Sequence, residues 1–184
     1  MEQSDEQIAE RVQNGDTDAF GELISRYEAK LKRYARKFLN TDHEIDDLVQ
    51  DVFIKAYTNI RSFDTNLRFS PWVYRIAHNT FVNELKRKSK VSFFDADTIL
   101  PRLPAQETAD GDSLDEEIRK EIDSLIKNLS PKYREVVVLH YFEHLSYQEI
   151  SEVLKIPIST VGVRMTRARK KLKEDYKLTE ENHE

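Results

Sequence analysis

The 184-residue sequence contains no cysteine, which excludes disulfide bridges and any zinc or iron–sulfur site held by thiolates. Glycine occurs only 4 times and 34% of the residues are charged, a composition that suits an all-helical protein. No apolar run is long enough to span a membrane, and the polar, acidic stretch Met1–Glu10 does not resemble a signal peptide. We therefore expect a cytoplasmic, all-α protein.

The formal net charge is −5, which argues against a protein that coats DNA without preference. Charges are nevertheless segregated along the chain. Basic residues gather in 26–37, 86–90 and 164–173, and acidic residues gather in 42–51, 95–121 and 174–184. This division is expected of a protein that meets DNA with one face and a basic protein partner with another.

The stretch Ser146–Lys173 predicts two helices joined by a tight turn, a helix-turn-helix of the kind that places its second helix in the DNA major groove. Ser146 and Glu149 form a capping box, so the first helix should begin at Tyr147. The apolar residues of the second helix recur at helical spacing and should face the core. They are Val161, Met165, Ala168 and Leu172.

The opposite face of that second helix carries groups that bind DNA, since hydroxyls and guanidinium groups contact phosphates and base edges. These residues are Ser159, Thr160, Val163, Arg164 and Arg167. The alternative is an ordinary helical hairpin with a solvated basic end. We favour DNA binding over that alternative.

The first 90 residues predict four helices that form one compact domain. Ser4 and Gln7 can cap a first helix that ends near Asn14, and a second should run over 16–39. Thr41 and Glu44 can cap a third, followed by a loop over 61–69; Ser70 as N-cap and Pro71 as first residue should open a fourth, to Lys88. The apolar stripe of the third helix comprises Ile45, Leu48, Val49, Val52, Phe53, Ala56 and Ile60.

The remaining sequence predicts an extended, partly flexible acidic linker over 91–112, a second small domain over 113–178 and an acidic tail over 179–184. Ser113 and Glu116 form a capping box for a helix that carries Leu114, Ile118, Ile122, Leu125 and Leu129. Ser130 and Pro131 open another, which carries Tyr133, Val136, Val137, Leu139 and Tyr141. The fold expected is two small helical domains joined by a flexible linker.

Three segments in this order resemble a known family. They are DDLVQDVFIKAY at Asp46–Tyr57, FSPWVYRIAHN at Phe69–Asn79, and the whole stretch Leu129–Leu172. The combination is similar to bacterial RNA polymerase sigma factors of the extracytoplasmic-function (ECF) group, which keep only the second and fourth conserved sigma regions.

The resemblance implies that the chain confers promoter recognition and DNA melting on core RNA polymerase. The helix Ile45–Ile60 would dock on the coiled coil of the β′ subunit through Asp47, Gln50 and Asp51, and the second domain would meet the β flap. Asp46 and Asp47 could instead only complement a helix dipole. Asp51 lies beyond the first turn and is better evidence for a partner.

The resemblance also implies that the first domain reads the promoter −10 element and captures an unstacked base. The implied contacts are Phe63, Asn66, Arg68, Asn79, Asn83, Lys86, Arg87 and Lys88. Phe69, Trp72 and Tyr74 are weaker candidates, and Trp72 is better explained as a core residue. The acidic linker would be threaded through the polymerase active-site cleft; a flexible tether with no further role is the alternative.

The second domain would read the −35 element in duplex form. The implied contacts are Ser159, Thr160, Val163, Arg164, Arg167, Lys170 and Lys171. Several positions depart from the family pattern. Many members have Gly where Lys155 stands, Thr or Ala where Pro71 stands, and Gly-Thr-Val-Lys-Ser where this chain has Ser-Thr-Val-Gly-Val at 159–163. Gly162 removes a DNA contact and costs up to ~1 kcal/mol relative to Ala inside a helix. The −35 preference therefore stays open.

Three other classes of protein agree less well with the sequence. A helix-turn-helix repressor or activator would need a dimerisation or effector domain, and a purely structural interaction protein would not need this Arg spacing. A nuclease could in principle hold Mg²⁺ on Asp47 and Asp51, but no acid–base or nucleophile set accompanies them. We expect no catalytic residue, metal, cofactor or small-molecule substrate. The resemblance further implies an anti-sigma factor, often membrane-anchored, that covers the polymerase-binding faces.

Overall fold

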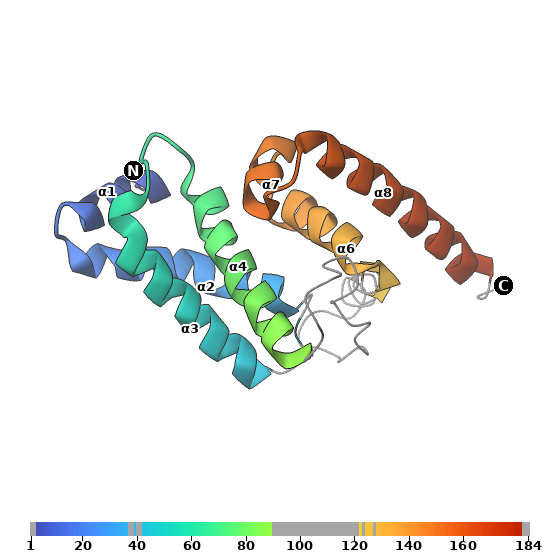
Figure 1. Cartoon of the computed structure of the whole chain (residues 1–184), viewed down its shortest axis with the longest axis horizontal. Helices are drawn as coiled ribbons and strands as arrows, with labels where there is room; N and C mark the ends of the chain where they lie inside the picture. Colours follow the sequence, from blue (N-terminus) through green and yellow to red (C-terminus); the bar gives the residue numbers. More distant parts are fainter. Residues whose placement is uncertain are drawn as a thin grey trace. The chain divides into compact units, whose positions relative to one another are not determined.

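The structure is a computed structural model that describes residues 3–36, 39, 42–89, 122, 124–126 and 128–181, with side chains except at 42, 88–89 and 177–181. The chain forms two compact units (Figure 1). The first comprises Met1–Val91 and Ser151–Lys155, and the second comprises Ser92–Ile150 and Ile156–Glu184. Within the described ranges every regular element is a helix, as predicted. The predicted linker over 91–112 lies outside the described residues.

The first unit is a helical bundle in which α3 packs against both α2 and α4. Two short 3₁₀ turns, η1 and η2, continue into or out of these helices. The elements are α1 (Asp5–Gln13), η1 (Thr17–Ala19), α2 (Phe20–Arg36), α3 (Asp42–Asn59), η2 (Ile60–Ser62) and α4 (Phe69–Ser89).

The core of this unit follows the predicted apolar stripe of α3, all seven residues of which are buried. Aromatic rings from the neighbouring helices complete it. Tyr34 of α2 meets Tyr74 and Phe81 of α4, with ring centroids 5.5 and 5.8 Å apart. Burial of such rings contributes more to the stability of a small domain than any surface contact.

The start of α1 agrees with its predicted capping box. Gln7 N–H donates to Ser4 Oγ, and Ser4 N–H donates to Gln7 Oε1, at 3.3 and 3.0 Å. The prediction for α4 is wrong by two residues, because the helix begins at Phe69 rather than after Ser70. The Phe69 N–H donates to Glu6 Oε1 of α1 at 3.0 Å, so a distant side chain supplies the acceptor that a local cap would provide.

The second unit, together with the segment Ser151–Lys155, contains the predicted helix-turn-helix, α7 (Tyr147–Leu154) followed by α8 (Ile158–Glu181). The Ser146–Glu149 capping box is formed, with hydrogen bonds of 2.7 and 3.2 Å. Before it lie α6 (Pro131–Val137), which packs against α8, and a π-helical turn η3 (Val138–Phe142). Val161, Met165 and Ala168 are fully buried, as predicted, and Leu172 is half-buried.

Two of the apolar residues on the first helices of the second unit are exposed. Tyr141 is 47% exposed because the π-helical turn adds a residue per turn and shifts the register of the helix. Arg169 Nε donates to its hydroxyl at 2.9 Å. Ile122 is 44% exposed, whereas Ile126 is buried in its place. Within the described ranges, no helix is both long and apolar enough to cross a membrane.

Candidate nucleic-acid interface

A groove of about 350 Å³ lies on the first unit where α3, η2 and α4 meet. Its volume is within the range of sites that bind small ligands. It holds two of the residues predicted to read the −10 element, Asn79 and Asn83. The lining residues are Lys55, Asn59, Ser62, Trp72, Arg75, Ile76, Asn79, Thr80 and Asn83.

The groove combines positive charge with amide groups and an aromatic surface. Lys55 comes from α3 and Arg75 from α4, and Lys55 Nζ donates to Thr80 Oγ1 at 3.1 Å. Trp72 is half-buried at the same groove. Cations bind phosphates, amides read base edges and an indole stacks on a base, so this set of groups suits a nucleotide of a single strand.

The predicted face of α4 continues beyond the groove. Asn79, Asn83, Lys86 and Arg87 are all exposed and recur at helical spacing. Arg87 donates two hydrogen bonds of 2.8 Å to Glu84, and these raise the pKa of Arg87, which is charged in any case. Phosphate would therefore compete with Glu84 for this guanidinium. The side chain of Lys88 lies outside the described residues.

Phe63, one of the predicted DNA contacts, is buried in this structure. Its side chain is 5% exposed, and its ring packs against Phe69 and Trp72 with centroids 5.4 and 5.3 Å apart. An aromatic residue in a polar loop can serve as the anchor of that loop, and sequence alone does not separate this role from base stacking. Phe69 and Tyr74 are buried as well.

The exposed part of the loop is the turn Asp64–Arg68. The backbone N–H and the side-chain amide of Asn66 both donate to Asp64 Oδ1, at 3.0 and 2.9 Å, and they lower the pKa of Asp64. Asn66 and Arg68 are exposed, where a nucleic acid could reach them. Leu67 is 61% exposed between them.

The predicted polymerase-binding residues lie together on the outer face of α3. Asp47, Gln50 and Asp51 are all exposed. The same face continues along the helix with Ile54 and Tyr57, which are 61% and 41% exposed. An acidic patch that ends in apolar side chains suits a protein partner better than it suits DNA.

The beginning of α3 shows that its acidic residues have different partners. Asp46 pairs with Lys32 of α2 at 3.0 Å, so it helps to join the two helices. Asp47 lies 3.5 Å from His43 Nδ1. The pKa of His43 is raised, mainly by a hydrogen bond between its side chain and its own backbone and then by the negative charge of Asp47.

The predicted −35 residues share the exposed side of α8. Val163 is 50% exposed, Arg167 and Lys170 are exposed, and Thr160 and Arg164 are partly exposed. The segment Ile158–Lys173 carries six basic side chains and no acidic one. Within the described part of the chain, neither Arg164 nor Arg167 forms an ion pair. The predicted contacts Ser159 and Lys171 lie on this side too.

Two of the departures from the family pattern, Lys155 and Gly162, have different structural consequences. Lys155 has φ 54°, a left-handed conformation in which glycine is favoured, so the turn keeps the geometry without the usual residue. Gly162 lies inside α8, and a Cβ built there would meet nothing within 4 Å. A larger side chain at 162 would therefore fit.

Several groove and surface residues were not identified from the sequence. Lys55, Arg75 and Asn59 line the groove, but they come from helices that the chain brings together only on folding. Nothing in their local pattern separates them from solvated surface residues. Ile54 was detectable as an apolar residue off the buried stripe of α3. Within the described residues no cluster of three or more metal-ligating side chains occurs.

Comparison with known proteins gives two family matches in one chain. Residues 23–91 match Sigma-70 region 2, and residues 119–172 match Sigma-70 region 4. The chain is also 35% identical to the ECF RNA polymerase sigma factor SigW of Bacillus subtilis (strain 168). That alignment covers 96% of this chain and 99% of SigW.

Solved structures with the same fold include two complexes. CnrH, in complex with the cytosolic domain of CnrY, is 26% identical with a TM-score of 0.70, over 96% of this chain and 99% of that one. The sigma factor RpoE, in complex with the anti-sigma factor NepR from Bartonella quintana, is 24% identical with a TM-score of 0.64. That match covers 86% of this chain and 96% of RpoE, and it supports the fold alone.

Proposed function

This chain belongs to the ECF RNA polymerase sigma factors, and we propose that it directs core RNA polymerase to promoters by reading the −10 and −35 elements with separate units. The −10 unit would comprise residues 1–90 and the −35 unit residues 113–178, with 91–112 as linker and 179–184 as tail. The observation that carries the proposal is the groove of the first unit, where cations, amides and an indole converge.

In the first unit, the groove would hold an unstacked base of the melted −10 element. Opening a duplex costs stacking and pairing energy, and binding of the extruded base and its phosphates offsets that cost. Lys55 and Arg75 would neutralise phosphates, and Asn79 and Asn83 would contact base edges. Asn66, Arg68, Lys86, Arg87 and Lys88 would follow the strand on either side.

In the second unit, α8 would enter the major groove of the −35 element. Arg164 and Arg167 can each form two parallel hydrogen bonds to a guanine or bind phosphate, and Ser159, Thr160, Lys170 and Lys171 would contact the backbone. Val163 would make an apolar contact with a base. The absence of a side chain at Gly162 leaves one potential contact unfilled.

The exposed face of α3 would bind the polymerase. Asp47, Gln50 and Asp51 supply negative charge and amide groups for a basic partner on the β′ coiled coil, and the β flap would meet the second unit. An anti-sigma factor would block these surfaces; RpoE, which has the same fold, has been solved in complex with the anti-sigma factor NepR. The chain would act in the cytoplasm, without catalysis of its own.

Run-off transcription with core bacterial RNA polymerase tests the proposal. Fragments of the host genome are transcribed with and without the chain. We expect transcripts from discrete start sites only when the chain is present. Their absence, with the polymerase active on another sigma factor, would contradict the proposal.

Two single variants then distinguish the roles of the −10 unit and the −35 unit on a mapped promoter. Arg75→Ala should impair opening of the −10 region while binding of the duplex −35 element persists. Arg164→Ala should weaken duplex binding first. Each variant is the control for the other, and equal effects of both on both steps would argue against separate readers.

A further inference from the structure

The loop that joins η2 to α4 is held at both ends by side chains of α1. Gln13 Nε2 donates to the carbonyl oxygens of Ile60 and Phe63, at 2.7 and 2.8 Å. Glu6 Oε1 accepts from the backbone N–H of Phe69 at 3.0 Å. The three bonds are part-buried and connect residues that are 47, 50 and 63 positions apart in the chain.

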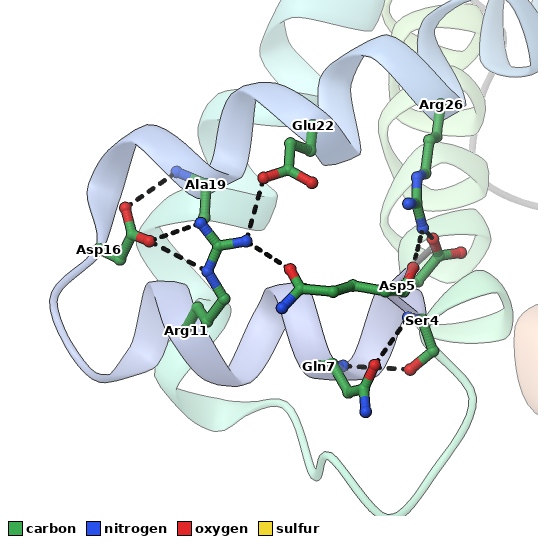
Figure 2. A network of polar contacts seen from close by, with 9 residues as sticks. Ser4, Asp5, Gln7, Arg11, Asp16, Ala19, Glu22 and Arg26 are labelled. Atoms are coloured by element: carbon green, nitrogen blue, oxygen red, sulfur yellow. Dashed lines mark hydrogen bonds and ion pairs between the residues drawn. The ribbon is translucent and has the colours of Figure 1, made fainter. Parts of the chain in front are cut away.

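The helix that supplies these side chains is itself fixed to the rest of the unit, as Figure 2 shows. Arg11 pairs with Asp16 and Glu22, at 2.7 and 3.1 Å. At the other end of α1, Asp5 pairs with Arg26 of α2 at 2.7 Å, in a half-buried position. Because α1 is tied down near both ends, Gln13 and Glu6 are attached to a rigid support.

The anchored ends of the loop connect α1 to the exposed turn and to the groove. At the first anchored end, the ring of Phe63 packs on Trp72, and Trp72 lines the groove. Between the two anchored ends lies the exposed turn Asp64–Arg68, in which the Asp64 carbonyl accepts a hydrogen bond from Leu67 N–H at 3.0 Å. A contact path therefore runs from α1 through the loop ends to the wall of the groove.

We propose that Gln13 and Glu6 are positioning residues that hold the turn Asp64–Arg68 and the Trp72 side of the groove in the geometry that captures single-stranded DNA. The inference rests on the proposed function. A loop ordered before binding loses less conformational entropy when a strand binds, so its affinity for that strand is higher. Neither residue touches DNA; each acts through backbone atoms of the loop.

The principal test replaces the donor while keeping the size of the side chain. Gln13→Leu removes both hydrogen bonds to the loop. Gln13→Lys keeps a donor and should restore most of the effect. Gln7→Leu is the matched control, because it breaks the capping box of α1 without touching the loop.

The assay uses holoenzyme formed from the full chain and core polymerase. The probe is a fluorescein-labelled nontemplate strand that spans the −10 element of a promoter mapped by run-off transcription. We expect Gln13→Leu to weaken strand binding about tenfold, the loss that two hydrogen bonds of ordinary strength produce. Its affinity for core polymerase and for the −35 duplex should equal that of the wild type.

A second pair of variants guards against a folding defect at position 13. Glu6→Gln keeps an acceptor for the Phe69 N–H, whereas Glu6→Leu removes it. Permanganate reactivity of unpaired thymines should fall for Glu6→Leu and stay near wild type for Glu6→Gln.

The outcomes are distinguishable. If wild-type holoenzyme opens the promoter and Gln13→Leu matches it, the positioning role is overturned and the proposed function stands. If Gln7→Leu falls as far as Gln13→Leu, general stability of α1 explains the loss and the positioning role is again overturned. If wild-type holoenzyme opens no promoter, the proposed function fails and the inference fails with it.

Discussion

The hydroxyl of Tyr27 donates a hydrogen bond of 2.6 Å to Asp5 Oδ2 and thereby joins α2 to the first turn of α1. Burial, and then the hydrogen bond to this carboxylate, raise the pKa of Tyr27 above its ordinary value of 10.0. The same Asp5 pairs with Arg26, so one carboxylate receives donors from two neighbouring residues of α2.

Alkaline pH should therefore destabilise the first unit. Because the pKa is higher in the folded than in the unfolded state, the stabilisation is fully present below about pH 10 and is lost as pH rises further. The loss contributed by this residue approaches ~1.4 kcal/mol per pH unit. Urea unfolding from pH 8 to pH 11 measures it. Tyr27→Phe should flatten the slope, and parallel slopes for the two proteins would contradict the prediction.

The turn of the helix-turn-helix should be stabilised by Lys155→Gly. Lys155 has φ 54°, and a side chain in this conformation is strained. Relief of the strain, less the greater backbone entropy of glycine in the unfolded chain, should add about 0.5–1 kcal/mol. Lys155→Ala removes the same charge but keeps a Cβ, so it should not reproduce the gain in urea or thermal unfolding.

Gly162→Ala should also stabilise the second unit, by up to ~1 kcal/mol, because alanine is the better helix former. The open space around the position means that no contact opposes the change. Thermal unfolding of the full chain measures the effect. A decrease in the midpoint would show that the backbone at Gly162 needs glycine for another reason.

Gly162→Lys should strengthen binding of the −35 duplex, provided that α8 lies in its major groove. One further phosphate contact should steepen the salt dependence of log K by about 0.9. Fluorescence anisotropy over a salt series measures the slope. Gly162→Gln adds a side chain without charge and should leave the slope unchanged; equal slopes for Lys and Gln would place position 162 away from the phosphates.

Two serines that precede helices in the second unit should respond differently to alanine. Ser146 Oγ accepts from the Glu149 N–H, so Ser146→Ala should cost about 1 kcal/mol. Ser130 Oγ is buried and has no hydrogen-bond partner among the residues that the structure describes, so Ser130→Ala should cost little or stabilise. Denaturant unfolding of both variants provides the comparison, and equal losses would contradict it.

Much of the fold could be predicted because its signals lie within one helical turn. The Ser4–Gln7 and Ser146–Glu149 capping boxes each join residues three positions apart, and both are formed. The apolar stripe of α3 repeats at the helical period, and all of it is buried. Such patterns depend only on the geometry of one helix and on residues close together in the sequence, so they can be recognised without the tertiary structure.

Other features depend on residues that are distant in the sequence. The serine before Pro71 indicated a cap, yet α4 begins at Phe69 because Glu6 accepts its N–H. The sequence predicted that Phe63 contacts DNA, but in the structure its ring packs against Phe69 and Trp72. Tyr141 lies in the π-helical turn, which shifts the helical register, and its side chain is exposed.

The sequence by itself determined the all-helical class, the helix-turn-helix, most helix positions and the membership of the sigma family. Periodicity, capping and the order of motifs depend only on the order of residues along the chain. Only the tertiary structure decided that Lys55 and Arg75 share a groove with Asn79, and that α1 anchors the loop beside it. These relationships arise when helices far apart in the chain pack together, because burial of their apolar faces brings together polar residues that have no local connection.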